Sequence, residues 1–65
     1  MKILKLPDVI KTTGLSRSTI YEKIKKDAFP KQVPLGAKSC GWLETEIFAW
    51  LESRVALRNS KAVVQ

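Results

Sequence analysis

Histidine is absent from this chain of 65 residues, and cysteine occurs only once, at Cys40. A single thiol excludes an internal disulfide framework and fits a reducing compartment, and it has no histidine partners with which to form a Cys/His zinc site. The chain also lacks an apolar run long enough for a signal peptide or a membrane-spanning helix. We therefore expect a cytoplasmic protein that holds no metal and has no membrane partner.

The residue patterns typical of enzymes are also missing. The sequence shows no constellation of paired carboxylates, no glycine-rich loop that could hold a phosphate group, and no spacing typical of metal ligands. We therefore expect no catalytic activity and no cofactor.

Basic residues, in contrast, are in clear excess. Lysine and arginine number 12 against six aspartate and glutamate residues, which gives a formal net charge of +6. Such an imbalance in a short chain favours a polyanionic partner such as nucleic acid. A chain of this length buries only about 60% of its extended surface, so we expect one domain with a small core.

The run from Thr13 to Tyr21 has the pattern of a helix-turn-helix motif. Gly14 permits a tight turn because it can adopt positive φ angles, Leu15 supplies an apolar contact between the helices, and Ser16 is a preferred N-cap. The pattern predicts a first helix over residues 7–13 and a second over residues 17–26. Ile20 and Ile24 lie one turn apart and should pack the second helix against the first.

The second helix carries the candidate DNA contacts. In a DNA-binding helix-turn-helix, the N-terminal residues of this helix meet base edges and phosphates in the major groove. Arginine commonly pairs with guanine, and tyrosine hydroxyls commonly bind phosphate. Two alternatives stay open, a local bond to the turn for the threonine and a place at the core edge for the tyrosine. The predicted contact residues of this helix are Arg17, Ser18, Thr19, Tyr21 and Lys25.

Residues 31–43 have the pattern of a small β-hairpin, or wing. Residues 32–35 can form a short extended segment and residues 40–43 a second strand, with a stretch of turn composition between them. Pro34 should confine the first strand to a sheet edge or leave it irregular. We attribute the end of the preceding helix to Pro30, because the residue before a proline is disfavoured in the α conformation. Lys38 and Ser39, at the tip of the wing, are candidate contacts to a phosphate or to the minor groove.

A third helix is predicted from Glu44 onward. Apolar residues recur every four positions, acidic residues occupy the first turn and arginines the last, as the helix dipole favours. We expect the domain to span residues 1–58 and residues 59–65 to form a disordered tail. The residues of this region expected in the core are Trp42, Ile47, Phe48, Trp50, Leu51 and Val55.

These segments, in this order, resemble the AlpA family of prophage regulatory proteins over roughly residues 3–54. The resemblance rests on the run 13–21, on Phe29-Pro30-Lys31, on Gly36 with Lys38 and Ser39, and on the segments 41–42 and 46–51. The family is similar to phage excisionases and to the DNA-binding domain of MerR-type regulators. The resemblance implies a mainly α, MerR-like winged helix-turn-helix fold with three helices and a β-hairpin wing.

The functional prediction is sequence-specific binding of double-stranded DNA as a phage-type or prophage-type transcriptional regulator. The helix over 17–26 would enter the major groove and the wing over 31–43 would contact the flanking backbone. Further partners would be additional copies of the chain on DNA, an integrase or RNA polymerase, and bound copies would lie on the nucleoid. One alternative is an excisionase-like recombination directionality factor that bends DNA at an attachment site. The other is a protein-interaction module that binds an acidic partner.

Overall fold

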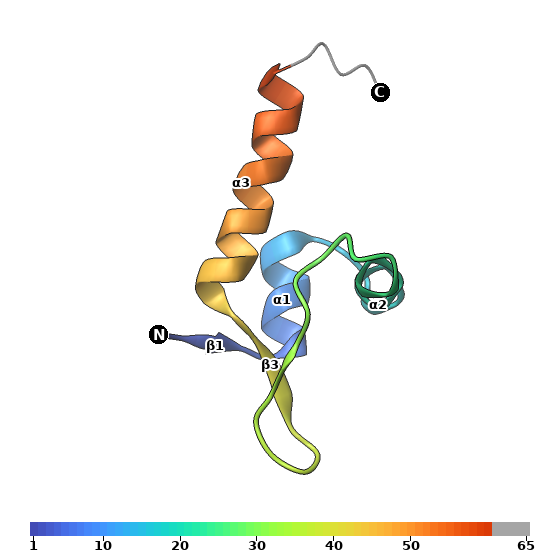
Figure 1. Ribbon diagram of the computed structural model, residues 1–65, viewed down its shortest axis with the longest axis vertical. Helices are drawn as coiled ribbons and strands as arrows, with labels where there is room; N and C mark the ends of the chain where they lie inside the picture. Colours follow the sequence, from blue (N-terminus) through green and yellow to red (C-terminus); the bar gives the residue numbers. More distant parts are fainter. Residues whose placement is uncertain (61–65) are drawn as a thin grey trace.

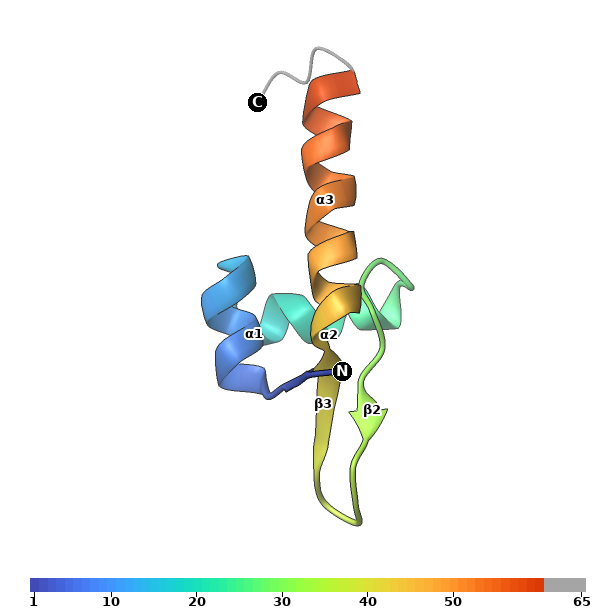
Figure 2. The same cartoon turned by 90° about the vertical axis from the view of Figure 1, so that its left-hand side faces the viewer.

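The computed structural model describes residues 1–60 and is mainly helical, with a small antiparallel sheet (Figures 1 and 2). The three helices and the hairpin confirm the predicted winged helix-turn-helix. None of the described helices is both long enough and apolar enough to cross a membrane. The elements are β1 (Ile3–Leu4), α1 (Leu6–Thr13), α2 (Arg17–Lys25), β2 (Val33–Pro34), β3 (Cys40–Leu43) and α3 (Glu44–Ser60).

The turn between α1 and α2 has the predicted chemistry. Gly14 adopts a left-handed conformation, with φ at 76°, and its N–H donates to the carbonyl oxygen of Ile10 at 2.8 Å. The side chain of Ser16 accepts a hydrogen bond from the backbone N–H of Thr19 at 3.2 Å, which confirms its role as the N-cap of α2. The only difference is that α1 begins at Leu6, one residue earlier than predicted, with its proline still in the first turn.

The C-terminus of α2 has a different cause from the one predicted. The helix ends one residue early, at Lys25, and the chain reverses at Asp27, whose φ is 57°. Asparagine and aspartate tolerate this left-handed region better than other residues that carry a Cβ. The N–H groups of Asp27 and Ala28 then donate, at 3.1 and 2.8 Å, to the carbonyl oxygens of Ile24 and Lys23. These two bonds form a Schellman motif, so the helix stops before Pro30 can affect it.

The sheet contains a strand that the sequence did not indicate. Its order is β1-β3-β2, and both pairs are antiparallel, with Leu4 opposite Trp42 and Val33 opposite Gly41. A Cβ atom on Gly41 would lie 2.5 Å from Cγ2 of Ile3, so the close approach of β1 to β3 depends on this glycine. Pro34 lies in β2, at the edge of the sheet, as predicted.

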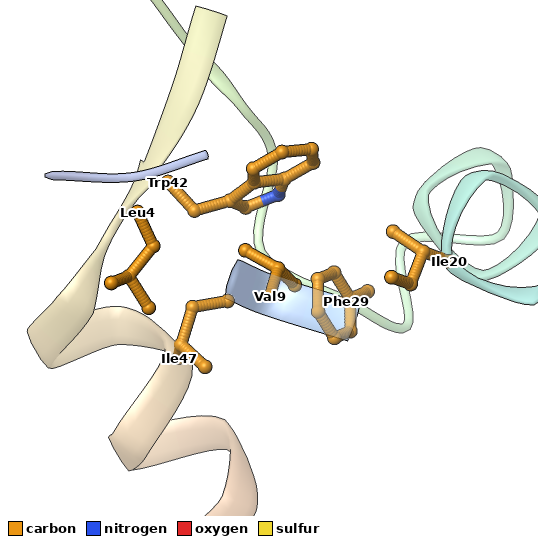
Figure 3. Close-up of a cluster of buried hydrophobic side chains, with 6 residues drawn as sticks. All are labelled: Leu4, Val9, Ile20, Phe29, Trp42 and Ile47. Carbon is orange, nitrogen blue, oxygen red and sulfur yellow. The ribbon is translucent and has the colours of Figure 1, made fainter. Parts of the chain in front are cut away.

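Six side chains form the core, one from each helix, one each from β1 and β3, and one from the loop after α2 (Figure 3). The prediction for Trp42 and Ile47 is confirmed, since neither side chain is exposed, and Trp50 and Leu51 pack against the cluster from its margin. The buried residues are Leu4, Val9, Ile20, Phe29, Trp42 and Ile47.

Two of the predicted core residues are exposed. Phe48 is 47% exposed and Val55 is 46% exposed. The prediction was wrong because helical periodicity shows which side chains share a face, but not how far the rest of the molecule extends along that face. The same projecting helix continues to Ser60, two residues beyond the predicted domain boundary at 58, since no glycine or proline interrupts it. The rest of the predicted tail, 61–65, lies outside the described residues.

Candidate nucleic-acid interface

The outward face of α2 carries most of the predicted contact residues. Arg17 and Ser18 in the first turn are exposed, and so is Lys25 at the other end of the helix. Tyr21 is half-buried, at the boundary between this face and the side that buries Ile20. The helix therefore holds its apolar side against the core and presents an arginine, a hydroxyl and a lysine outward.

Thr19 is engaged within the helix start. Its Oγ1 accepts a hydrogen bond from Oγ of Ser16 at 2.9 Å, while its backbone N–H donates to the same Ser16 oxygen. This is the local bond that the sequence left open as the alternative for Thr19. The side chain is half-buried and helps to order the first turn.

The first turn of α2 is electrostatically suited to an anion. It contains no acidic residue, and the N-terminus of a helix concentrates positive partial charge and unpaired N–H groups. An arginine at this position is unfavourable for the isolated helix, because its charge opposes the dipole. A phosphate or a base edge would relieve that repulsion.

The segment 17–38 contains six of the basic residues and only two acidic ones. Both acidic residues are neutralised locally: Glu22 lies 3.6 Å from Lys26 and Asp27 lies 3.1 Å from Lys31. The remaining four cations form no ion pair within residues 1–60. They are Arg17, Lys23, Lys25 and Lys38, of which all but Lys23 are exposed.

The wing forms a second, separate projection. Its loop is closed by a hydrogen bond of 2.7 Å from the N–H of Leu35 to the carbonyl oxygen of Ser39, and the side chains of Lys38 and Ser39 are exposed. In both views the hairpin points away from the C-terminal end of α3, and α2 lies between these two extremes (Figures 1 and 2). The structure thus places the predicted residues in two groups, one on α2 and one on the wing.

Two tryptophans hold the segment that joins these groups. The indole N–H of Trp42 donates to the carbonyl oxygen of Pro30 at 3.0 Å, and that of Trp50 donates to the carbonyl oxygen of Ala28 at 2.8 Å. Between these two anchor points, Phe29 is buried and meets the Trp50 ring edge-on, with centroids 4.8 Å apart. The segment 28–30 is therefore fixed on both sides, which sets the position of the wing relative to α2.

This positioning role was missed in the sequence, where both tryptophans were interpreted as apolar core residues, with stacking on nucleic-acid bases as the alternative. The signal that could have revealed it is the indole nitrogen, which needs a hydrogen-bond acceptor when the ring is buried. A loop rich in turn residues, such as Asp27–Pro30, offers free carbonyl oxygens close by. Only the tertiary structure shows which carbonyls each indole reaches.

Comparison with known proteins identifies a matching family and similar proteins. Residues 2–55 match the model of a family described as the prophage CP4-57 regulatory protein AlpA. The chain belongs to the AlpA family. It is 48% identical over 63 residues to the DNA-binding transcriptional activator AlpA of Escherichia coli strain K12, an alignment that covers 88% of this chain and 90% of that protein.

A second relative comes from a bacteriophage. The chain is 51% identical over 58 residues to the uncharacterized protein ORF88 of Enterobacteria phage P4. The alignment covers 89% of this AlpA family chain but 66% of the phage protein. The resemblance deduced from the sequence is therefore confirmed, and the relatives include a protein of a phage and a protein of a bacterium.

Proposed function

We propose that this AlpA family protein regulates transcription by binding double-stranded DNA in a sequence-specific manner. In this proposal α2 enters the major groove and the wing contacts the backbone beside it. The observation that carries the proposal is the face of α2 itself. It presents Arg17 and Ser18 at a helix N-terminus that contains no acidic residue, on a helix whose opposite side is anchored in the core.

The distribution of charge supports the same proposal. Lys25 at the end of α2 and Lys38 at the wing tip are exposed and form no ion pair within residues 1–60, so they would contribute phosphate contacts, which dominate affinity without reading sequence. Arg17 would supply base readout, because a guanidinium can donate two hydrogen bonds to guanine. The relative in E. coli that is named a DNA-binding transcriptional activator shares 48% identity with this chain, which makes the same activity the natural proposal here.

The rigid segment 28–30 matters for specificity in this arrangement. Two projections that contact one duplex must keep a constant spacing, because a loose connection would lose binding energy when it is ordered. The indoles of Trp42 and Trp50 order that segment before DNA arrives.

The test is fluorescence anisotropy with labelled duplexes from the genetic neighbourhood of the protein and a scrambled duplex of equal length. Arg17→Ala should weaken binding to the native site by about 10- to 100-fold, equivalent to about 1–3 kcal/mol, and should leave scrambled binding much less affected. The matched control is Lys5→Ala. Lys5 is also exposed and forms no ion pair within residues 1–60, but it lies at the end of α1 remote from the turn.

A second pair of variants separates base readout from phosphate contact. Arg17→Lys keeps the charge but removes the planar fork, so it should reduce specificity if Arg17 reads guanine. Lys38→Ala should weaken native and scrambled binding equally, and the slope of log affinity against log salt should fall in magnitude by about one. Unchanged affinity for the native site in Arg17→Ala would refute the proposed interface.

A further inference from the structure

One face of α3 has a regular pattern of apolar residues that the fold of residues 1–60 uses only in part. Glu44, Phe48, Leu51, Val55 and Arg58 follow one another at intervals of four, three, four and three residues. This spacing keeps side chains on one face of a helix and is the spacing of the contact positions in paired helices. The three central residues are apolar, and the two end residues carry opposite charges.

The structure leaves this face, which we call the α3 seam, largely open. Phe48 is 47% exposed and Val55 is 46% exposed, while Leu51 is half-buried at the margin of the core. Every residue from 52 to 59 is exposed, because this half of α3 projects past the rest of the molecule (Figure 2). Among residues 1–60 nothing covers the exposed parts of these apolar side chains, so this face is available to a partner.

The order of charges along the α3 seam indicates which molecule fits. Glu44 and Arg58 each lie seven residues from Leu51, on opposite sides of it. If a second α3 packs antiparallel with Leu51 at the two-fold axis, Glu44 faces Arg58 of the second copy at both ends. Phe48 then faces Val55 of the second copy. A parallel pair would instead place like charges together, which is destabilising.

We propose that a second copy of this chain binds the α3 seam, with the two α3 helices antiparallel and crossing near Leu51. The contacts that Glu44 and Arg58 make within the single chain are compatible with this arrangement. Glu44 lies 3.9 Å from Lys2, and the two side chains are 28% and 69% exposed, while within residues 1–60 the side chain of Arg58 donates to that of its neighbour Asn59 alone. The Arg58 contact is exposed and the Lys2–Glu44 pair is long and open to solvent on the lysine side, so Arg58 can exchange its partner and Glu44 can share its own at small cost.

The size of the seam sets the strength of the association. Three apolar side chains per helix make an interface below the usual size of stable complexes, so the free protein should dimerise weakly. Two copies on neighbouring DNA sites would have a high effective concentration, and the same contact would then give cooperative binding. This last consequence rests on the proposed DNA-binding function, whereas the self-association does not.

Sedimentation equilibrium without DNA tests the contact directly. Val55→Asp should weaken self-association at least ~10-fold, because it places a charge in the apolar seam. Leu57→Asp is the matched control. Leu57 is 45% exposed, nearly equal to Val55, but two residues along a helix it points to the opposite side.

The sedimentation results decide whether the α3 seam is the surface through which the chain self-associates. Dimerisation of the natural chain that is lost in Val55→Asp and kept in Leu57→Asp supports the proposal. A chain that stays monomeric up to about 1 mM, the weak limit of specific association, overturns it, and so does equal loss in both variants. Because no DNA is present, failure here leaves the proposed DNA binding untouched, and failure of DNA binding leaves this test valid.

The orientation is tested by cross-linking in a Cys40→Ser background, which removes the natural thiol. Phe48→Cys and Val55→Cys chains of different mass are mixed and oxidised under mild conditions. The antiparallel arrangement predicts mixed 48–55 disulfides in excess of disulfides between identical chains. An excess of 48–48 and 55–55 products would overturn the antiparallel arrangement.

A charge exchange provides an independent check of the orientation. Arg58→Glu alone should weaken dimerisation, because it would face Glu44 of the second copy. The double variant Glu44→Lys with Arg58→Glu restores opposite charges at both ends and should recover the natural affinity. A double variant as weak as the single one would contradict the assigned pairing.

Discussion

The two halves of α3 share one series of apolar positions but meet different surroundings. The first half, Glu44–Leu51, contributes the completely buried Ile47 and the half-buried Trp50, whereas every residue from 52 to 59 is exposed. Eight residues are too few to form a stable helix in water by themselves. The distal half is therefore helical because it continues a helix that the core has already nucleated.

This contrast shows that one periodic pattern can serve two purposes along one helix. Ile47, Leu51 and Val55 form a single series in the sequence, but the core uses its beginning and leaves its end in solvent. The proximal half determines the stability of the domain. The distal half is available for a partner, and we have assigned that partner as a second copy of the chain.

The largest difference in stability is expected between substitutions at the two ends of this series, Ile47 and Val55. Ile47→Ala should lower the free energy of unfolding by about 2–5 kcal/mol, because it leaves a cavity at a completely buried position. Val55→Ala should change it by less than about 0.5 kcal/mol in the monomer. Urea unfolding at low protein concentration measures both, and equal losses would show that the distal half belongs to the folded core.

A second comparison concerns the two tryptophans that hold segment 28–30 from β3 and from α3. Trp42→Phe should cost about 1–3 kcal/mol, because it removes a donor from the partly buried carbonyl oxygen of Pro30. Trp50→Phe should cost about 1 kcal/mol or less, since its acceptor lies at an exposed residue, Ala28, where water can replace the indole. Thermal unfolding of both variants provides the measurement. A larger effect at Trp50 would mean that the segment 28–30 is held mainly from α3.

The smallest change in the free energy of unfolding is expected for substitution of Arg54, near the junction of the two halves of α3. The guanidinium of Arg54 lies over the ring of Trp50, 5.7 Å from its centroid. Arg54→Ala should lower the free energy of unfolding by about 0.5–1 kcal/mol, the contribution of an exposed cation–π contact. Arg54→Lys, compared in the same unfolding experiment, should retain part of it. No difference between Arg54→Ala and the natural chain would show that this contact adds nothing to the stability of the fold.

Much of the architecture could be predicted from local chemistry. The turn at Gly14, the cap at Ser16 and the edge position of Pro34 each follow from a single residue with a strong backbone preference, and each is confirmed. Strand β1 could not be predicted, because two residues carry no periodicity and pair only when β3 is already in place. The reversal at Asp27 was hidden by Pro30, the stronger signal in the sequence.

The candidate site is only partly determined by the sequence. The spacing of Arg17, Ser18, Tyr21 and Lys25 predicts that they share one side of a helix, and the structure places that side away from the core. The distance between α2 and the wing depends on the two indole bonds to segment 28–30, which join residues 12 and 22 positions apart in the chain. Whether these side chains bind DNA stays a prediction, with Arg17→Ala as its test.

By itself, the sequence determined the helix-turn-helix, the hairpin and the basic character of the segment 17–38, because caps, turns and charge are properties of neighbouring residues. The tertiary structure alone decided where the core ends along α3 and which carbonyls the tryptophans hold. Those outcomes depend on contacts between distant segments, and no local preference specifies them. They explain why Val55 faces solvent while Ile47, two turns earlier in the same series, lies in the core.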